Sequence, residues 1–157
     1  MTTALCPGSF DPPTLGHVDV LDRALGLFDR VVVGVVVNPS KAPLFSLEER
    51  ADVFDELFGG RIEVVGFEGL VVDLAAKLGA DVLVKGLRES YDWEYEVQMA
   101  HMNRHLTGIE TVFLPTAAEY RFISSTLVKE IWRFGGDIAG LVPDPVLAAL
   151  ATKEPAP

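Results

Sequence analysis

The sequence contains a single cysteine, and it lacks both an excess of basic residues and a long apolar run. Cys6 stands alone among 157 residues, so an internal disulfide is excluded and we interpret Cys6 as a packed core residue. The formal net charge is −10, from 13 basic and 23 acidic residues, which argues against broad nucleic-acid binding. No apolar run approaches the roughly 18 residues that a membrane span needs, so we expect no membrane partner.

The remaining composition is typical of a soluble globular protein. Hydrophobic residues make up 49% of the chain and charged residues 23%, which is too apolar for a disordered chain. The first six residues have no basic region before a long apolar core, so we predict no signal peptide and expect a cytoplasmic protein. We expect one domain over residues 1–157, with a loose tail at about 153–157.

Strand patterns alternate with helical patterns along the chain. Residues 31–37 are mainly β-branched without polar alternation, which is typical of a parallel strand covered on both faces. Ser46 and Glu49 have the spacing of a capping box, which predicts the start of a helix. Strands are expected at residues 3–6, 31–37, 62–65, 82–84 and 111–114. Helices are expected at about 18–28, 46–59, 70–78, 90–106 and 124–134, with a short one after residue 143.

This order predicts an α/β fold with a doubly wound, five-stranded parallel sheet, because parallel neighbours need crossover connections. Ligands bind such sheets outside the carboxyl ends of the strands, where the strand order reverses. Four polar segments directly follow predicted strands and therefore predict a site at this edge. They are residues 7–17, 38–41, 85–88 and 120–126.

The first of these segments, PGSFDPPTLGH, ends on one of three histidines. His17 would lie in the first turn of the helix that follows, where it can donate a hydrogen bond to a phosphate oxygen. The helix N-terminus itself favours an anion. The alternative is an ordinary helix cap with a surface histidine.

The later segments add cations and hydroxyl groups. Lys85 and Arg88 surround a glycine, which suits phosphate recognition, although a charged loop that begins a helix is the structural alternative. Residues 123–126, Ile-Ser-Ser-Thr, can cap a helix and also direct hydroxyl and N–H groups at phosphate oxygens. Lys41, considered alone, is more commonly an ordinary solvated lysine.

Three other patterns are interpreted as structural. His101 and His105 have the spacing of zinc ligands on a helix, but the intervening residues lack the glutamate of a zinc protease motif. We therefore predict no metal site formed by the protein. A packing face is predicted for Met99, Met102 and Leu106. A polar helix surface is predicted for Asp92, Glu94 and Glu96.

Eight phrases, in order and over about the whole chain, resemble bacterial phosphopantetheine adenylyltransferases of the nucleotidyltransferase superfamily. They are PGSFDP (7–12), TLGH (14–17), NPSK (38–41), FSLEER (45–50), KGLR (85–88), EYE (94–96), AHMNRH (100–105) and FISSTLVKE (122–130). The resemblance implies a Rossmann-like fold and transfer of the adenylyl group of ATP to 4′-phosphopantetheine. The products would be dephospho-coenzyme A and pyrophosphate, in the penultimate step of coenzyme A biosynthesis. It further implies Mg²⁺ arriving with ATP, a homohexamer, and feedback inhibition by coenzyme A.

The resemblance also implies residue roles. His17 would contact the ATP phosphates and stabilise charge in the transition state. The implied catalytic residues are His17, Lys41, Lys85 and Arg88. The implied substrate-binding residues are Ser9, Lys41, Val71 and Lys85. The implied ATP-binding residues are Ser9, Phe10, His17, Gly86, Leu87, Arg88, Glu96, Tyr120, Arg121, Phe122, Ile123, Ser124, Ser125, Thr126 and Lys129.

Two positions depart from some members of that family. Lys85 is arginine in some, and lysine keeps the charge but loses the bidentate fork. Arg121 commonly corresponds to a small residue, and the sequence leaves open whether it contacts nucleotide or solvent. Two other functions also stay open. One is nucleotidyl transfer to another phosphorylated acceptor, such as nicotinamide mononucleotide or glycerol 3-phosphate. The other is nucleotide sensing without turnover.

Overall fold

Strands and helices alternate in the predicted order. The computed structural model describes residues 1–38, 40, 42–88 and 90–154, with the backbone alone at residues 90 and 91. The strands of this described part are β1 (Thr3–Gly8), β2 (Arg30–Val36), β3 (Ile62–Phe67), β4 (Val82–Leu87) and β5 (Glu110–Pro115). The α-helices are α1 (Leu15–Leu25), α2 (Leu47–Phe58), α3 (Val71–Leu78), α4 (Ser90–Thr107), α5 (Ser125–Arg133) and α6 (Asp144–Ala151). A short 3₁₀ helix, η1 (Ala118–Tyr120), precedes α5 and was not predicted.

The strands form a parallel sheet with the order β3-β2-β1-β4-β5. The chain runs outward from β1 to β3 and then crosses back through α3, so that β4 lies on the other side of β1. The predicted α/β fold with a doubly wound, five-stranded parallel sheet is therefore confirmed. The strand order reverses between β1 and β4, and this is where such sheets bind ligands.

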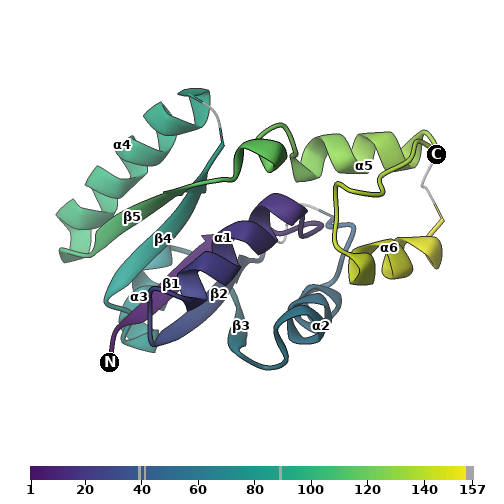
Figure 1. The fold of residues 1–157 in the computed structure, drawn as a ribbon. Helices are drawn as coiled ribbons and strands as arrows, with labels where there is room; N and C mark the ends of the chain where they lie inside the picture. Colours follow the sequence, from purple (N-terminus) through teal and green to yellow (C-terminus); the bar gives the residue numbers. More distant parts are fainter. Residues whose placement is uncertain (39, 41, 89, 155–157) are drawn as a thin grey trace.

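Apolar side chains on the two faces of the sheet contact different helices. Val33 of β2 belongs to a buried cluster with Leu21 of α1 and Phe54 of α2. Its neighbour Val32 points the other way and packs with Leu74 of α3. Figure 1 accordingly shows α1 in front of the sheet and α3 behind it. The apolar run of β2 is thus covered on both faces, as its sequence predicts.

The two central strands separate towards their carboxyl ends. Within the described residues, β1 pairs with β4 at Ala4 and Leu5 alone. By contrast, β1 stays paired with β2 as far as Gly8, and β4 stays paired with β5 as far as Leu87. Each central strand therefore follows its outer neighbour, and a gap opens between β1 and β4 at the edge where a ligand is expected.

A further apolar cluster lies beside α2 and joins the last two helices to the rest of the protein. Phe45, Val128 and Val146 are fully or almost fully buried in it. Figure 1 shows α5 and α6 together at the yellow end of the chain. Lys153 lies at the start of the expected tail. Its Nζ atom is 2.6 Å from Glu49 Oε1 and 5.1 Å from the centre of the Phe45 ring. Residues 155–157 lie outside the described residues.

Several predicted boundaries were wrong. β4 was expected to end at residue 84, but pairing of Leu87 with Pro115 of β5 extends it, so residues 85–87 belong to the strand. β1 and β3 are longer than predicted for the same reason, since each stays paired with β2. α1 ends at Leu25 with Gly26 as its C-cap, so Phe28 lies beyond the helix although it still packs against the core.

The packing face predicted on α4 is not covered within this single chain. Met99, Met102 and Leu106 are 37%, 55% and 52% exposed. Other residues of α4 contact the rest of the chain instead. Asn103 is buried, and the indole of Trp93, although 50% exposed, lies 5.5 Å from the ring of Phe113 in β5.

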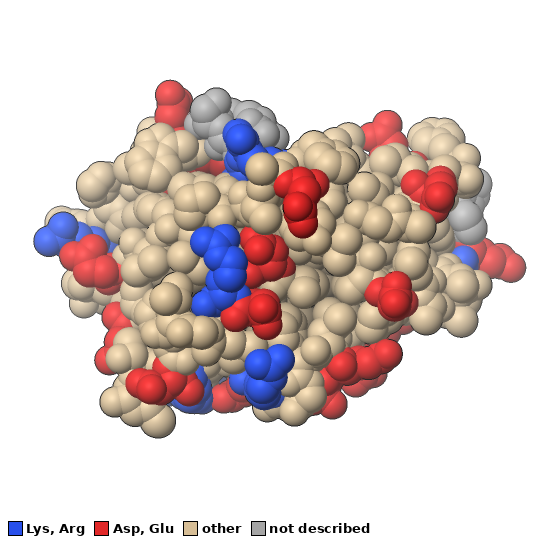
Figure 2. Space-filling model, viewed as in Figure 1, with Lys and Arg blue, Asp and Glu red and all other residues tan. Residues whose placement is uncertain are grey.

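The surface agrees with the acidic composition. On the face shown in Figure 2, acidic side chains are widely spread, and the Lys and Arg side chains lie beside them rather than in one broad basic patch. Among the described residues, no helix combines the length and the apolar character that crossing a membrane requires.

Candidate active site

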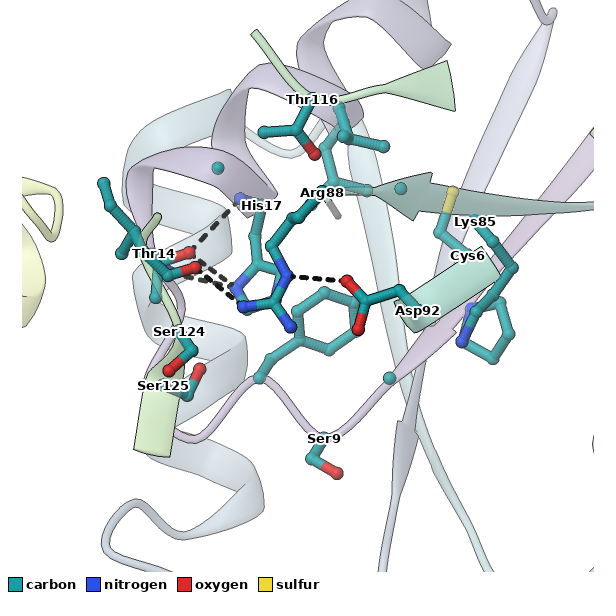
Figure 3. A pocket seen from close by; sticks show the side chains of 18 of the residues that line it. Cys6, Ser9, Thr14, His17, Lys85, Arg88, Asp92, Thr116, Ser124 and Ser125 are labelled. Carbon is teal, nitrogen blue, oxygen red and sulfur yellow. Dashed lines mark hydrogen bonds and ion pairs between the residues drawn. The ribbon is translucent and has the colours of Figure 1, made fainter. Parts of the chain in front are cut away.

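A cavity of about 300 Å³ opens where β1 and β4 separate. Its floor is formed by the ends of these strands, including Cys6 and Gly86. The N-terminal turns of α1 and α5 and the first turns of α4 supply the remaining walls. In Figure 3, Thr14, Ser124 and Ser125 lie on one side and Lys85 and Asp92 on the other, with His17 and Arg88 between them.

His17 is fixed by the cap of α1. Thr14 is the N-cap residue, and its Oγ1 accepts a hydrogen bond from the His17 backbone N–H at 3.4 Å. In return, His17 Nδ1 accepts from the Thr14 backbone N–H at 3.0 Å. An Nδ1 atom that accepts a hydrogen bond carries no proton, so the proton of the neutral ring is on Nε2. The cap therefore leaves His17 with an N–H donor for a ligand.

The surroundings of His17 keep its ring neutral. Burial lowers the pKa of the imidazole from 6.5 to about 4, and the nearby charges of Arg88 and Lys85 act in the same direction. The ring is thus neutral at physiological pH. His17 is part of a helix cap, as the structural alternative expects, and it also lines the cavity, as the site hypothesis expects. Its contact with a phosphate stays a prediction.

The loop before α1 packs tightly against His17. The ring of Phe10 lies 4.9 Å from the imidazole, in an edge-on arrangement, and 5.3 Å from the ring of Phe54 in α2. Phe10 has a φ of 49°, a left-handed conformation that is uncommon for residues other than glycine. Gly8 makes room for this arrangement, since a Cβ there would lie 2.9 Å from the Phe10 ring.

The cations of β4 and its following residue are paired with carboxylates of α4. Lys85 Nζ lies 3.1 Å from Glu96 Oε1, and Arg88 Nε lies 3.3 Å from Asp92 Oδ2. Arg88 also donates from Nη1 to the Ile123 carbonyl at 2.9 Å. These four charged side chains all line the cavity.

The N-terminus of α5 supplies further donors. Ser124 is its N-cap, with Oγ accepting from the Leu127 N–H at 3.1 Å. Ser125 Oγ instead donates to the Pro12 carbonyl at 2.7 Å. These two hydroxyl groups therefore have structural roles. The unpaired N–H groups of a helix N-terminus and its positive dipole remain suited to an anion.

The structure brings most of the predicted site residues together. Those that line the cavity are Ser9, Phe10, His17, Lys85, Gly86, Arg88, Glu96, Ile123, Ser124, Ser125 and Thr126. Those described outside its lining are Val71, Leu87, Tyr120, Arg121, Phe122 and Lys129. Lys41 lies outside the described residues.

Individual reasons account for some of the outlying residues. Val71 begins α3, on the opposite side of the sheet from α1. Phe122 is 66% exposed. Arg121 Nε donates to the Arg88 carbonyl at 2.9 Å. Lys129 points to Asp11, with 3.3 Å between Nζ and Oδ2.

Two polar lining residues, Asp92 and Thr116, lie outside the segments and site residues that the sequence predicted. Asp92 was interpreted as polar helix surface, which is wrong, because Arg88 draws it to the cavity. Its spacing of four residues from both Arg88 and Glu96 was the available signal. Thr116 also lines the cavity, directly after β5. The other polar segments were predicted to form the site because they directly follow strands, and the same signal applies to Thr116.

The cavity is equipped to bind and stabilise an anion rather than to attack one. The interpretation of Cys6 as a core residue is confirmed by its 3% exposure, and burial raises the pKa of its thiol to about 12. A thiol with that pKa is a poor nucleophile at neutral pH. Among the described residues, no group of three or more His, Cys, Asp or Glu side chains is placed to hold a metal ion.

Comparisons with known proteins agree with this arrangement. A family model described as cytidylyltransferase-like matches residues 5–131. Similar solved structures include a protein assigned as a nicotinate-nucleotide adenylyltransferase from Vibrio parahaemolyticus, at 17% identity and a TM-score of 0.69, covering 97% of this chain and 100% of that one. Another is a lipopolysaccharide core biosynthesis protein from Thermoplasma volcanium, at 24% identity and a TM-score of 0.57, covering 74% of this chain and 97% of that one. These two likenesses support the fold alone. The family match over most of the sequence shows that the chain belongs to the cytidylyltransferase-like family of nucleotidyltransferases.

Proposed function

We propose that the protein transfers the adenylyl group of ATP to 4′-phosphopantetheine and forms dephospho-coenzyme A and pyrophosphate. Nucleotidyl transfer from a nucleoside triphosphate is typical of its family. The observation that carries the proposal is the neutral His17 donor beside Lys85 and Arg88 at the edge between β1 and β4. The choice of acceptor is supported by the eight phrases that resemble bacterial phosphopantetheine adenylyltransferases.

The proposed reaction needs no nucleophile from the protein. An anionic phosphate oxygen of phosphopantetheine attacks the α-phosphorus of ATP and forms a new P–O bond. The bond from the α-phosphorus to the bridging oxygen breaks, and its electron pair leaves with pyrophosphate. The acceptor is already an anion, so the protein contributes positioning and charge stabilisation.

Each charged group has a defined role in this proposal. His17 Nε2–H donates to a phosphoryl oxygen as negative charge builds up in the transition state. Lys85 and Arg88 exchange their α4 carboxylates for phosphate oxygens, which reduces repulsion between the two polyanionic substrates. The N-termini of α1 and α5 add N–H donors. Ser9, Phe10, Gly86, Glu96 and residues 123–126 would contact the nucleotide.

Mg²⁺ enters this proposal as part of the MgATP substrate. Asp92 and Glu96 are the cavity's described carboxylates, and each already pairs with a cation. Mg²⁺ commonly keeps several waters and binds through substrate phosphates. We also propose a cytoplasmic homohexamer that coenzyme A inhibits, as the resemblance implies. The exposed apolar side chains of α4 offer a surface that another copy could cover.

The test combines a product assay with two variants of His17. The purified protein, ATP, Mg²⁺ and 4′-phosphopantetheine should yield dephospho-coenzyme A and pyrophosphate in equal amounts. His17→Ala should lower kcat by roughly 10²- to 10³-fold, as expected when one preorganised donor is lost. His17→Gln is the matched control for folding, because glutamine at this position retains the capping box. It should melt closer to the wild type than His17→Ala does.

The same assay distinguishes the alternatives. Product formation with nicotinamide mononucleotide or glycerol 3-phosphate, but not with phosphopantetheine, would refute the proposed acceptor and leave nucleotidyl transfer intact. Binding of ATP without pyrophosphate release for any acceptor would instead indicate a nucleotide sensor. An unchanged kcat in His17→Ala would refute the assigned role of His17.

A further inference from the structure

Asp11 connects three separate segments beside the cavity. The residue is 7% exposed and its side chain 10%. Oδ1 accepts from the Phe45 backbone N–H at 2.8 Å, and Oδ2 accepts from the Leu44 backbone N–H at 3.0 Å. Oδ2 also lies 3.3 Å from Lys129 Nζ in α5. One buried side chain therefore joins the loop before α1 to the segment before α2 and to α5.

The residue next to Asp11 needs such support. Phe10 has a left-handed backbone conformation, with φ at 49°, and residues other than glycine hold it only when their surroundings impose it. On the other side of Phe10, the Ser9 carbonyl accepts from Arg50 Nη1 at 2.7 Å. Arg50 is itself 4% exposed and bonded to the Ser46 carbonyl. Two buried charged side chains thus hold the loop on either side of Phe10.

Phe10 connects the constrained backbone of the loop to His17 through a contact between their rings. Its ring contacts the imidazole edge-on at 4.9 Å, while the Thr14 backbone N–H holds the Nδ1 atom of the same imidazole. A shift of the Phe10 backbone would move the ring against His17. The direction of the Nε2–H group therefore depends on the anchors of the loop.

We propose that Asp11 is a positioning residue for His17. It acts through its hydrogen bonds to Leu44 and Phe45, which fix Phe10 and hence the imidazole. In this role Asp11 also pairs with the Lys129 ammonium group. Lys129 therefore stabilises the loop and does not contact the nucleotide. The kinetic part of this inference rests on the proposed function, whereas the structural part does not.

The test compares Asp11→Asn with Lys129→Met. Asparagine is nearly isosteric with aspartate, but its single carbonyl oxygen can replace only one of the two acceptors. Methionine at position 129 removes the ammonium partner and leaves both backbone hydrogen bonds in place. Asp11→Asn should therefore disturb His17, and Lys129→Met should not.

The first measurement needs no substrate. In ¹⁵N NMR spectra of the full chain, Asp11→Asn should shift the His17 ring nitrogens and speed amide exchange of Leu44 and Phe45. Lys129→Met should leave both close to the wild type. Unchanged His17 signals in Asp11→Asn, or equal changes in both variants, would overturn the proposal. This result is independent of which reaction the protein catalyses.

The second measurement is kinetic. Asp11→Asn should lower kcat roughly 10-fold, as expected for small misplacement of a catalytic group, while KM for ATP stays within about 2-fold. A large rise in KM for ATP in Lys129→Met would show direct nucleotide contact and refute the proposed role of Lys129. If the wild type makes no product, the proposed function fails and the NMR result still decides the role of Asp11.

A third variant covers the case in which Asp11→Asn does not fold. Phe10→Leu leaves the Asp11 contacts intact and removes the ring that contacts His17. It should produce the same shift of the His17 signals and a similar loss of kcat. Wild-type signals and wild-type kcat in Phe10→Leu would overturn the proposed connection.

Discussion

The two walls of the cavity are held by different kinds of interaction. On the loop wall, residues 8–17, the contacts are made to backbone groups. His17 is bonded to Thr14 and Asp11 to the segment before α2. On the strand wall, residues 85–96, Lys85 and Arg88 pair with partly exposed carboxylates, and Arg88 has one backbone contact, to the Ile123 carbonyl. Backbone contacts fix a geometry, whereas partly exposed ion pairs exchange partners at small cost. The loop wall is therefore preformed, and the charges of the strand wall are ready to move to a ligand.

The largest expected effect is a loss of stability when the close packing of the strand-wall backbone is disturbed. A Cβ at Gly86 would lie 2.9 Å from Val20 Cγ2 of α1. We expect Gly86→Ala to destabilise the protein by roughly 1–3 kcal/mol through overpacking, measured by urea unfolding. The charged side chains of this wall can exchange ion-pair partners, whereas its backbone at Gly86 is closely packed against α1.

The double variant Gly86→Ala/Val20→Ala is the control. Removing the Val20 methyl groups gives the new Cβ room, so the double variant should be more stable than the sum of the two single losses predicts. Additive losses would show that Val20 is not the cause.

Lowering the pH should reduce the free energy of unfolding through His17 of the loop wall. The pKa of His17 is about 4 in the folded protein, against 6.5 for an unperturbed histidine. Between these values the unfolded chain binds a proton that the folded chain does not, so stability falls as the pH drops through this window. From pH 7 to pH 5 we expect a loss on the order of 2 kcal/mol from His17.

His17→Gln isolates this contribution, because it keeps the cap and does not titrate. Urea unfolding of both proteins at pH 7 and pH 5 should show a larger loss for the wild type. Equal losses would place the acid sensitivity on other groups.

The smallest expected effect concerns the ion pairs of the strand wall. Asp92→Asn removes the carboxylate that competes with a ligand for Arg88, so MgATP should bind about 2- to 5-fold more tightly, as the strength of partly exposed ion pairs suggests. Titration calorimetry at fixed ionic strength measures this change.

Glu94→Gln removes the same charge from α4, but from an exposed residue outside the cavity lining. It should change the affinity less than about 1.5-fold. If both variants tighten binding equally, the effect comes from net charge and not from release of Arg88.

The sequence predicted the fold well because the signals for it are local. The β-branched run of β2 and the capping box at Ser46 determine a strand and a helix start without reference to distant residues. The rule that ligands bind after parallel strands then identified most of the cavity lining. The polar residues at the end of β4 looked like a loop because the pairing of Leu87 with Pro115 depends on a distant strand.

Some features of the site depend on contacts between residues that are far apart in the sequence. Asp11 lies within the PGSFDPPTLGH segment, but its backbone partners follow it by more than thirty residues. Asp92, by contrast, is only four residues from Arg88, and its ion pair with that residue has a local signal that the polar-surface interpretation overlooked. The tautomer and the pKa of His17 follow from burial and neighbouring charges, which spacing alone does not give.

Formation of the cavity during folding depends on the short pairing of β1 with β4. Ala4 and Val82 meet across about half of the chain, so the cavity cannot exist in any early segment of the chain on its own. The binding-competent state forms only once the whole crossover has closed, and loop closure over that distance is slow. A ligand that bridges the two strands would bind only after this event and would hold the halves of the sheet together. Proteolysis during refolding, in the presence and absence of ATP, would measure this event. Resistance that depends on ATP should begin when β1 and β4 pair.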